Sequence, residues 1–427
     1  MSESQRPPDE QGRMQGMDSG ERPADPASSP EPPEDGGALL RIEAWFSTRI
    51  GGVLVPLAAA LLAFLVGGVV ILFTGHSPLG AYKAIFEGTG LNYPYMWITG
   101  QETRGAWSDL QQTLIITSPL ILTALAVAFA FRCGMFNIGG QGQYWVGLIA
   151  ALFVGVHLDG LPRPLHVLVC VAAALGAGFV WGGIAGALRA TVGAHEVITT
   201  IMLNWIAIYV GKYLFELGGP LQGDQPSIPR SDDILPSAQL WPIGSGLQPL
   251  HAGIFISIGA LFVYSVILNR TTLGYEVRAV GFNPEAARYG GISVGRNYFL
   301  ALAISGAFAG IAGSVDVLGW KYRVATNDLD VAGGVGYAGI AVALLGRNKA
   351  VGIFFAALLF GALQVGTSTR QLDPSVFPPE LAGNLATMIQ ALIILFVGAE
   401  LLIVSAWGLR KRVGFSGPAR VQPEMKA

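Results

Sequence analysis

The chain alternates long apolar runs with short polar connections, and this pattern predicts a bundle of membrane-spanning helices. An α-helix rises about 1.5 Å per residue, so about 20 apolar residues cross a hydrocarbon core of about 30 Å. The run at 52–73 contains no charged residue and meets this requirement. Further runs predict spans at 114–131, 142–156, 165–188, 197–215, 253–268, 298–319, 334–345, 351–365 and 385–404. We therefore expect an all-α integral membrane protein of about ten transmembrane helices.

The third and eighth runs, 142–156 and 334–345, are shorter than the roughly 17 residues that a spanning helix needs, so we expect them to be tilted, broken or re-entrant. They also resemble each other, with GGQGQYWVGLIAAL at 139–152 and GGVGYAGIAVALL at 333–345. An odd offset of five spans gives the two copies opposite directions across the bilayer, as an inverted 5+5 repeat requires. Chance similarity between glycine-rich membrane segments is the alternative, and the sequence leaves both open.

The basic residues orient the spans, because Lys and Arg near span ends are retained on the cytoplasmic side. With the N-terminus inside, every inner connection is basic. The residues concerned are Arg41, Arg49, Arg132, Arg189, Arg270, Arg278, Arg288, Arg296, Arg347, Lys349, Arg410, Lys411 and Arg412. Acidic residues such as Asp159, Asp232 and Asp233 fall in the outer connections. Both termini are therefore predicted to be cytoplasmic.

The two ends of the chain differ from its middle. Residues 1–37 are rich in Pro, Ser and acidic residues, and they cannot bury enough apolar surface to offset the entropy of ordering. We expect a disordered cytoplasmic tail there, a transmembrane domain at 38–406 and a second cytoplasmic tail at 407–427. The N-terminal segment also lacks the basic-then-apolar layout of a cleavable signal, so the first span should be retained.

Composition supports a membrane protein and excludes several other classes. The 427 residues are 52% hydrophobic and 13% charged, whereas soluble domains carry roughly 25% charged residues. A net charge of -2 with scattered basic residues disfavours nucleic-acid binding. The two cysteines and five histidines show no disulfide, metal or triad spacing, so no metal and no cofactor is expected. A membrane-embedded enzyme is disfavoured because no span gathers ionisable residues.

Charges inside apolar runs are few, and they bear on how transport is powered. Lys212, Asp316 and Glu400 each lie toward a span end, where a side chain can reach the interface or be hydrated. A proton-driven transporter usually needs an ionisable relay deep in the bundle. Its absence favours an energy source outside the membrane domain, although a sodium site built from carbonyls stays open.

The longest polar inner connection, 270–296, predicts a short capped helix. Asn283 is a good N-cap, Pro284 suits the first helical position, and Gly290 with Gly291 ends the helix. Such a helix on the cytoplasmic face is a rigid lever that a partner protein could contact. An amphipathic connector lying on anionic lipid through its arginines is equally consistent with this sequence.

Four passages together carry a family resemblance. FRCGMFNIGGQGQ, HEVITTIMLNWIA, GYEVRAVGFNPEAARYGGI and GYAGIAVALLGRNKAVGIFFAALLFGAL occur in this order. They resemble permease subunits of bacterial ABC importers in the ribose, branched-chain amino acid and nucleoside group, above all the nucleoside permeases, over roughly 114–404. The acidic N-terminal tail is outside that pattern, and His195 stands where the family is expected to have Asn.

The resemblance implies an inner-membrane permease subunit that translocates a nucleoside-like or simple-sugar-like solute and is itself not an enzyme. Its implied partners are a cytoplasmic ABC ATPase subunit, a second permease subunit in a homodimer or heterodimer, an extracellular solute-binding protein, and membrane lipid. An ion-coupled secondary transporter with an inverted-repeat fold is the alternative.

The resemblance also assigns roles to residues. The family's coupling helix docks on the ATPase, which implies that role here for Gly281, Asn283, Pro284, Ala286, Ala287 and Gly290. Polar and indole side chains on apolar spans are the candidates for the solute path, namely Asn137, Gln141, Gln143, Trp145, Asn204, Trp205 and Gln364. The alternative for each polar residue is a helix-to-helix hydrogen bond.

Overall fold

The computed structural model describes residues 56–100, 104–246, 248–329, 334–368 and 379–398, and regular structure in that part of the chain is helical. Every predicted apolar run contains a helix in its described residues. The predicted tails at 1–37 and 407–427, together with Glu400, lie outside the described residues.

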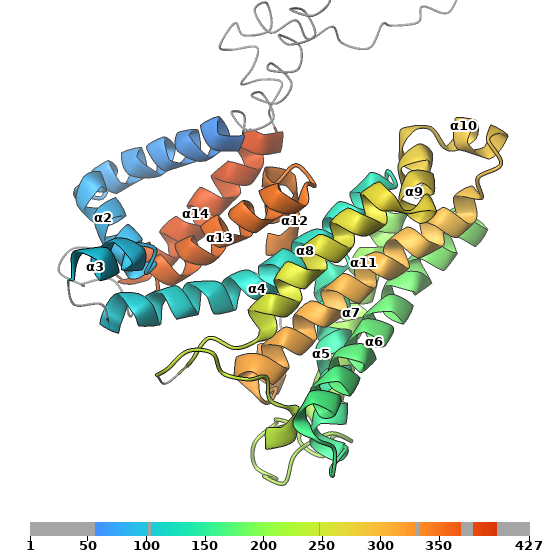
Figure 1. Cartoon of the computed structure of the whole chain (residues 1–427), viewed down its shortest axis with the longest axis horizontal. Helices are drawn as coiled ribbons and strands as arrows, with labels where there is room; N and C mark the ends of the chain where they lie inside the picture. The colour runs from blue at the N-terminus through green and yellow to red at the C-terminus, as the bar shows by residue number, and fades with distance from the viewer. Residues whose placement is uncertain (1–55, 101–103, 247, 330–333, 369–378, 399–427) are drawn as a thin grey trace, which may run out of the picture. The chain divides into compact units, whose positions relative to one another are not determined.

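Six described helices are long and apolar enough to cross a membrane, by length and composition. They are Pro56–Phe73, Gly105–Arg132, Arg163–Val192, Glu196–Phe215, Gly253–Arg270 and Val294–Lys321. In the labels of Figure 1 the last five belong to α4 (Arg104–Arg132), α6 (Arg163–Val192), α7 (Glu196–Phe215), α8 (Gly253–Arg270) and α11 (Val294–Asp316). Further helices are α5 (Gly140–His157), α12 (Val335–Leu345), α13 (Ala350–Gly366) and α14 (Pro379–Gly398).

Two helices between the first two predicted spans were absent from the prediction, because neither is long enough to give a membrane signal. They are α2 (Pro78–Gly88), capped by the Ser77 hydroxyl, and α3 (Tyr93–Thr99). In addition, α4 begins at Arg104 rather than at 114. Its first turns are polar, and Gln111 there bonds to the backbone of Ser245 (3.1 Å) and Leu250 (3.0 Å). Hydropathy marks the apolar part of such a helix and misses its polar extension.

The shortest of these apolar helices, α12, starts in the interior of the bundle. Its 11 residues rise about 16 Å, roughly half of a hydrocarbon core. The hydroxyl of Thr123, well inside α4, donates to the carbonyl of Val335 at 3.1 Å. This contact fixes the first turn of α12 beside the middle of α4.

Glycines allow α5, α6 and α11 to pack backbone against backbone. A Cβ added to Gly178 on α6 would collide with the carbonyl of Gly306 on α11. A Cβ added to Gly147 on α5 would collide with the backbone of Gly310. Such close approach of small residues is a main source of helix association in membranes, and it explains why the glycines fall within apolar runs.

The two ends of this helix group carry different connections. At one end the segment 216–252, with the short helix η1 (Pro236–Ala238), lies along the residues that follow α11. Ser231 donates its N–H to the carbonyl of Val324 (2.8 Å), and Ile234 donates to Tyr322 (2.9 Å). At the opposite end α9 (Thr272–Phe282) and α10 (Pro284–Tyr289) extend beyond α8 and α11 (Figure 1).

Candidate functional site

A buried polar network surrounds the start of α5 and contains predicted path residues. The Asn137 amide donates to the side-chain oxygens of Gln143 (2.8 Å) and Ser305 (2.6 Å). The same side chain accepts from the N–H of Gly139 (2.8 Å). Asn137 therefore links Gln143 on α5 to Ser305 on α11.

Two further predicted residues fix the first turn of α12. The Gln141 carbonyl oxygen accepts from the N–H of Gly336 at 2.8 Å. The Asn204 amide on α7 donates to the carbonyl of Ile138 and to the hydroxyl of Tyr337, both at 2.9 Å. Gln141 and Asn204 thus hold α12 against α5 and α7.

A cavity of about 650 Å³ lies between α12, α13 and α14. This volume is within the range of about 300 to 1,000 Å³ that is typical of small-molecule sites. The side chains that line it and matter for chemistry are Tyr337, Phe360, Gln364, Thr367, Ser368, Thr387 and Gln390. Of the predicted path residues, Gln364 lies here. The buried network stands directly behind the α12 wall, since Tyr337 belongs to both.

One residue of the cavity lining, Gln390, has a hydrogen-bond donor without a partner in the described part of the chain. The Gln390 Nε2 atom is buried and has no hydrogen-bond partner within the described part of the chain. The hydroxyls of Thr367 and Thr387 donate to carbonyls of their own segments, at 2.6 Å to Leu363 and 3.2 Å to Gly383. The Thr387 hydroxyl is exposed, so its oxygen lone pairs are left to accept a hydrogen bond from a ligand.

The two tryptophans predicted for the path lie elsewhere. The Trp145 ring contacts the Tyr144 ring, with centroids 5.0 Å apart, and the Lys321 ammonium lies 5.4 Å from the Trp145 ring centre. Trp205 stacks on Tyr209 and is 44% exposed on the surface of α7. Neither tryptophan lines the cavity.

A buried ionic cluster joins α5 to the end of α11, where the chain forms a π-helical turn, η2 (Val317–Lys321). The Tyr144 hydroxyl and the Trp320 indole both donate to the Asp316 carboxylate, at 2.5 and 3.1 Å. The Lys321 ammonium is 3.9 Å from that carboxylate. Hydration of Asp316 at a span end is therefore wrong: its side chain is 3% exposed, and protein donors take the place of water.

The predicted cap of α10 is present. The Asn283 side-chain oxygen accepts from the N–H groups of Glu285 (3.0 Å) and Ala286 (3.1 Å), and Pro284 is the first helical residue. Two aromatic residues lie at the ends of this segment: Phe282, the last residue of α9, is 92% exposed, and Tyr289, the last residue of α10, is 93% exposed.

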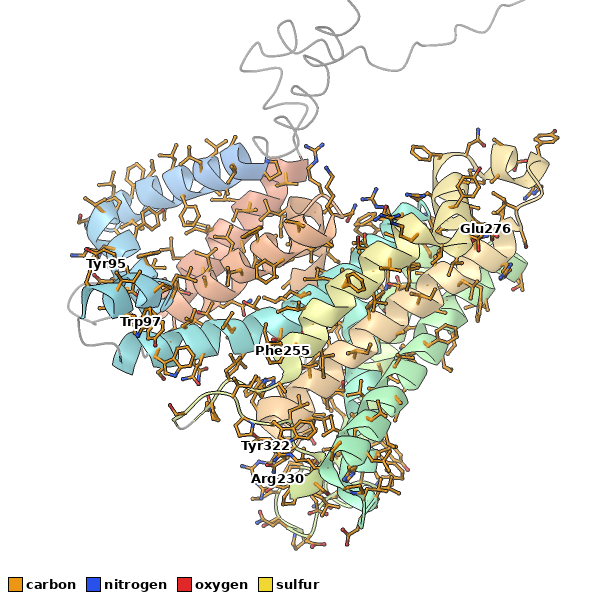
Figure 2. The ribbon with its side chains drawn as sticks, viewed as in Figure 1. Tyr95, Trp97, Arg230, Phe255, Glu276 and Tyr322 are labelled. Carbon is orange, nitrogen blue, oxygen red and sulfur yellow. The ribbon has the colours of Figure 1, made fainter. Side chains whose placement is uncertain are left out.

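The same protrusion is anchored on two membrane helices. Glu276 on α9, labelled in Figure 2, accepts a hydrogen bond from Asn297 on α11 at 3.0 Å. A Cβ added to Gly281 would collide with the backbone of Arg132 at the end of α4. The Arg132 guanidinium donates to the carbonyl of Asn348, in the turn between α12 and α13, at 2.8 Å. Contacts therefore run from the α9–α10 protrusion to the turn that joins α12 and α13, two of the helices that line the cavity.

The sequence prediction missed Tyr337, Phe360 and Gln390 in the cavity and Phe282 and Tyr289 beside α10. Gln390 meets the criterion that selected Gln364, a polar residue within an apolar run, and could have been found. The aromatic residues carried no such signal, because apolar runs and amphipathic connections contain many aromatic side chains.

Comparison with known proteins identifies relatives of this chain. The guanosine ABC transporter permease protein NupP of Bacillus subtilis is 37% identical over 367 residues, which cover 86% of this chain and 99% of that protein. The nucleoside ABC transporter permease protein NupB of Lactococcus lactis is 34% identical over 82% of this chain and 92% of its own. The glucose ABC transporter permease protein TsgB13 of Haloferax volcanii is 34% identical over 84% and 90%.

Residues 110–398 match the family described as branched-chain amino acid transport system, permease component. Permeases of this kind are transport components and not enzymes. The matched region covers α4 through α14, and so includes the buried network, the cavity and the α9–α10 protrusion. The chain belongs to this family of ABC transporter permeases.

Proposed function

We propose that this chain is the membrane subunit of an ATP-driven importer that carries nucleoside-like solutes across the bacterial inner membrane. Relatives named for guanosine and for nucleosides cover more than four-fifths of the chain. A relative named for glucose is 34% identical, so simple sugars are the second solute class to test. The single observation that carries the proposal is the run of contacts from the α9–α10 protrusion, through Gly281 and Arg132, to the turn between the cavity-lining helices α12 and α13.

The α9–α10 protrusion is the proposed docking point for a cytoplasmic ATPase subunit. Phe282 and Tyr289 offer two aromatic side chains to such a partner, and the Asn283 cap keeps the helix between them rigid. The residues singled out in the sequence have graded roles: Gly281 anchors the protrusion, Asn283 and Pro284 start the helix, and Ala287 is buried beneath it. Ala286 and Gly290 complete the docking segment.

The proposed topology has about ten spans, with both termini and α10 in the cytoplasm. Arg270, Arg278, Arg288 and Arg296 gather at the α10 end, as retained basic residues should. The 5+5 inverted repeat has specific support, because its two glycine-rich motifs contact each other where Gln141 bonds to Gly336. In this arrangement α12 crosses half of the bilayer and begins near its middle, as broken helices at transporter sites do.

The remaining partners follow from the same arrangement. A second permease subunit completes the path, and an extracellular solute-binding protein delivers solute at the end that carries 216–252. Closure of the ATPase would move the Arg132–Asn348 contact and shift α12 and α13 between two states. Asn137, Gln141, Gln143 and Asn204 then act behind the path by holding α12, while Gln364 faces it. The roles predicted for Trp145 and Trp205 stay predictions.

Ion coupling was the alternative, and the relatives disfavour it because they are ABC transporter permeases. The α10 variants test the proposal. In proteoliposomes with the cognate ATPase and solute receptor, Phe282→Ala combined with Tyr289→Ala should reduce solute-stimulated ATP hydrolysis at least about tenfold. Phe255→Ala combined with Tyr213→Ala is the matched control. Phe255 lies on α8, away from α10 (Figure 2), Tyr213 lies on α7, and the two are 64% and 60% exposed. Equal stimulation in both double variants would refute docking at α10.

A further inference from the structure

We infer that the cavity between α12, α13 and α14 is a nucleoside-binding site in which Gln390 reads the edge of the base. The inference rests on the proposed function, because it assumes that nucleosides enter this path. It adds the residues that hold the solute and the part of the solute that each one contacts.

The first argument is the state of Gln390. A buried amide N–H without a partner is unfavourable, so native proteins rarely retain one unless a ligand or a functional state uses it. The Nε2 atom of Gln390 is buried without a partner in the described part of the chain, and its residue lines the cavity. The 6-carbonyl oxygen of a nucleobase would accept this hydrogen bond.

The second argument is the order of side chains along the cavity. Because α13 and α14 follow one another and run in opposite directions (Figure 1), the end of α13 lies level with the start of α14. Hydroxyl groups therefore gather at one end, from Thr367, Ser368 and Thr387. One to two turns deeper the wall is formed by Phe360 and Ile394 together with Gln390. A nucleoside has the same order, with ribose hydroxyls at one end and a flat ring with a polar edge at the other.

The third argument concerns Tyr337. Its hydroxyl accepts from Asn204 at 2.9 Å, which fixes the ring in the α12 wall and leaves its aromatic surface for contact. An aromatic wall suits a flat base. A hexose carries hydroxyls around its whole ring, and beside Phe360 and Ile394 several of them would lose their hydrogen bonds. The cavity therefore favours a nucleoside over glucose.

The test is equilibrium binding of labelled inosine to the purified permease–ATPase complex without the solute receptor, so that the receptor's own specificity does not enter. Purine riboside, which lacks the 6-oxygen, is the matched ligand. Gln390→Leu is the test variant. Gln112→Leu is the matched control. Gln112 lies on the polar extension of α4, outside the cavity, and its side chain bonds to that of Gln248.

The unaltered complex should bind inosine about tenfold more tightly than purine riboside, the ratio expected for one hydrogen bond to a buried donor. Gln390→Leu should weaken inosine about tenfold and bind both ligands equally, while Gln112→Leu behaves as the unaltered complex does. The ligand-free Tm of Gln390→Leu should be unchanged or higher, because an unpaired buried donor is removed. A merely structural glutamine would instead lower that Tm.

Three results would overturn the inference: no inosine binding to the unaltered complex, undiminished inosine binding by Gln390→Leu, or glucose binding as tight as that of inosine. ATP-driven inosine uptake by the complete importer distinguishes failure of this binding site from failure of the proposed function. Uptake together with undiminished binding by Gln390→Leu refutes this site alone. Absence of uptake of any nucleoside by the unaltered importer refutes the proposed function.

Discussion

Gly281 lies so close to the backbone carbonyl of Arg132 that no side chain fits between them. The contact joins α9 to the end of α4, and the Arg132 guanidinium continues it to Asn348 at 2.8 Å. The Tyr264 hydroxyl donates to the same Asn348 carbonyl at 2.8 Å. Arg347 and Asn348 both have positive φ, 52° and 54°. Residues other than glycine rarely adopt this conformation unless surrounding contacts maintain it. The turn that joins two walls of the cavity is thus held by the helix that supports α9.

The first prediction concerns this contact. Gly281→Ala should reduce solute-stimulated ATP hydrolysis at least about tenfold, because an added Cβ pushes α9 away from α4. Gly259→Ala on α8 is the control, since a Cβ there meets no atom within 4 Å. ATP hydrolysis by the reconstituted importer is the measurement. Equal rates in the two variants would show that the contact between Gly281 and Arg132 is not needed for coupling to the ATPase.

The second prediction concerns the Asn348 turn. Arg132→Met removes a charge-assisted hydrogen bond and should lower the free energy of unfolding by about 1.5 to 3 kcal/mol. Arg230→Met removes an exposed bond to Gln225 and should cost at most about 1 kcal/mol. Denaturant unfolding in detergent compares them, and similar losses would contradict the role given to Arg132.

The third prediction concerns the buried carboxylate. Asp316→Ala should destabilise by about 3 to 5 kcal/mol, because it leaves Lys321 and the Tyr144 hydroxyl without their buried partner. Asp233→Ala is matched: its ion pair with Arg323 is 3.2 Å long, but the carboxylate side chain is 61% exposed, so at most about 1 kcal/mol is expected. Thermal unfolding of the two variants decides between a structural cluster and a hydrated surface charge.

The fourth prediction is a pH dependence from His251, in the connection that precedes α8. Burial lowers the pKa of His251 to about 4, and Asp316 partly opposes this. The unfolded pKa is about 6.5, so stability is full above that value and falls as the pH drops toward the folded pKa. The loss should reach about 2 kcal/mol near pH 5.

His251→Gln should remove most of that slope between about pH 7 and 5, whereas His157→Gln, at an exposed site, should leave it unchanged. Tm measured across this range is the readout. A slope that survives His251→Gln would assign the pH dependence to another group.

The sequence predicted the helices of this protein better than its site. Charge-free runs such as 165–188 indicate helices directly. An unpaired backbone polar group in lipid is costly, and a helix pairs these groups within its own segment. The cap at Asn283 was also predictable, since it depends on neighbours in sequence. In contrast, α2 and α3 are too short and too polar to give a hydropathy signal.

The cavity could not be predicted because its walls come from three helices whose mutual placement is tertiary. Gln141 and Asn204 were predicted for the solute path, with a helix-to-helix hydrogen bond as the alternative. In the structure both contact the first turn of α12, and sequence alone could not decide between contact with solute and contact with α12. Gln364 and Gln390 look alike in sequence, and only the fold shows that the second has an N–H without a partner among the described residues. The environment of Asp316 likewise depended on partners from α5.

The most direct test of the account is uphill uptake of labelled guanosine into proteoliposomes that contain the complete importer, with proton and sodium gradients collapsed. Accumulation should require both ATP and the ATPase subunit. If the purified permease alone accumulates guanosine against its gradient, energy does not enter through α10 and the account is contradicted.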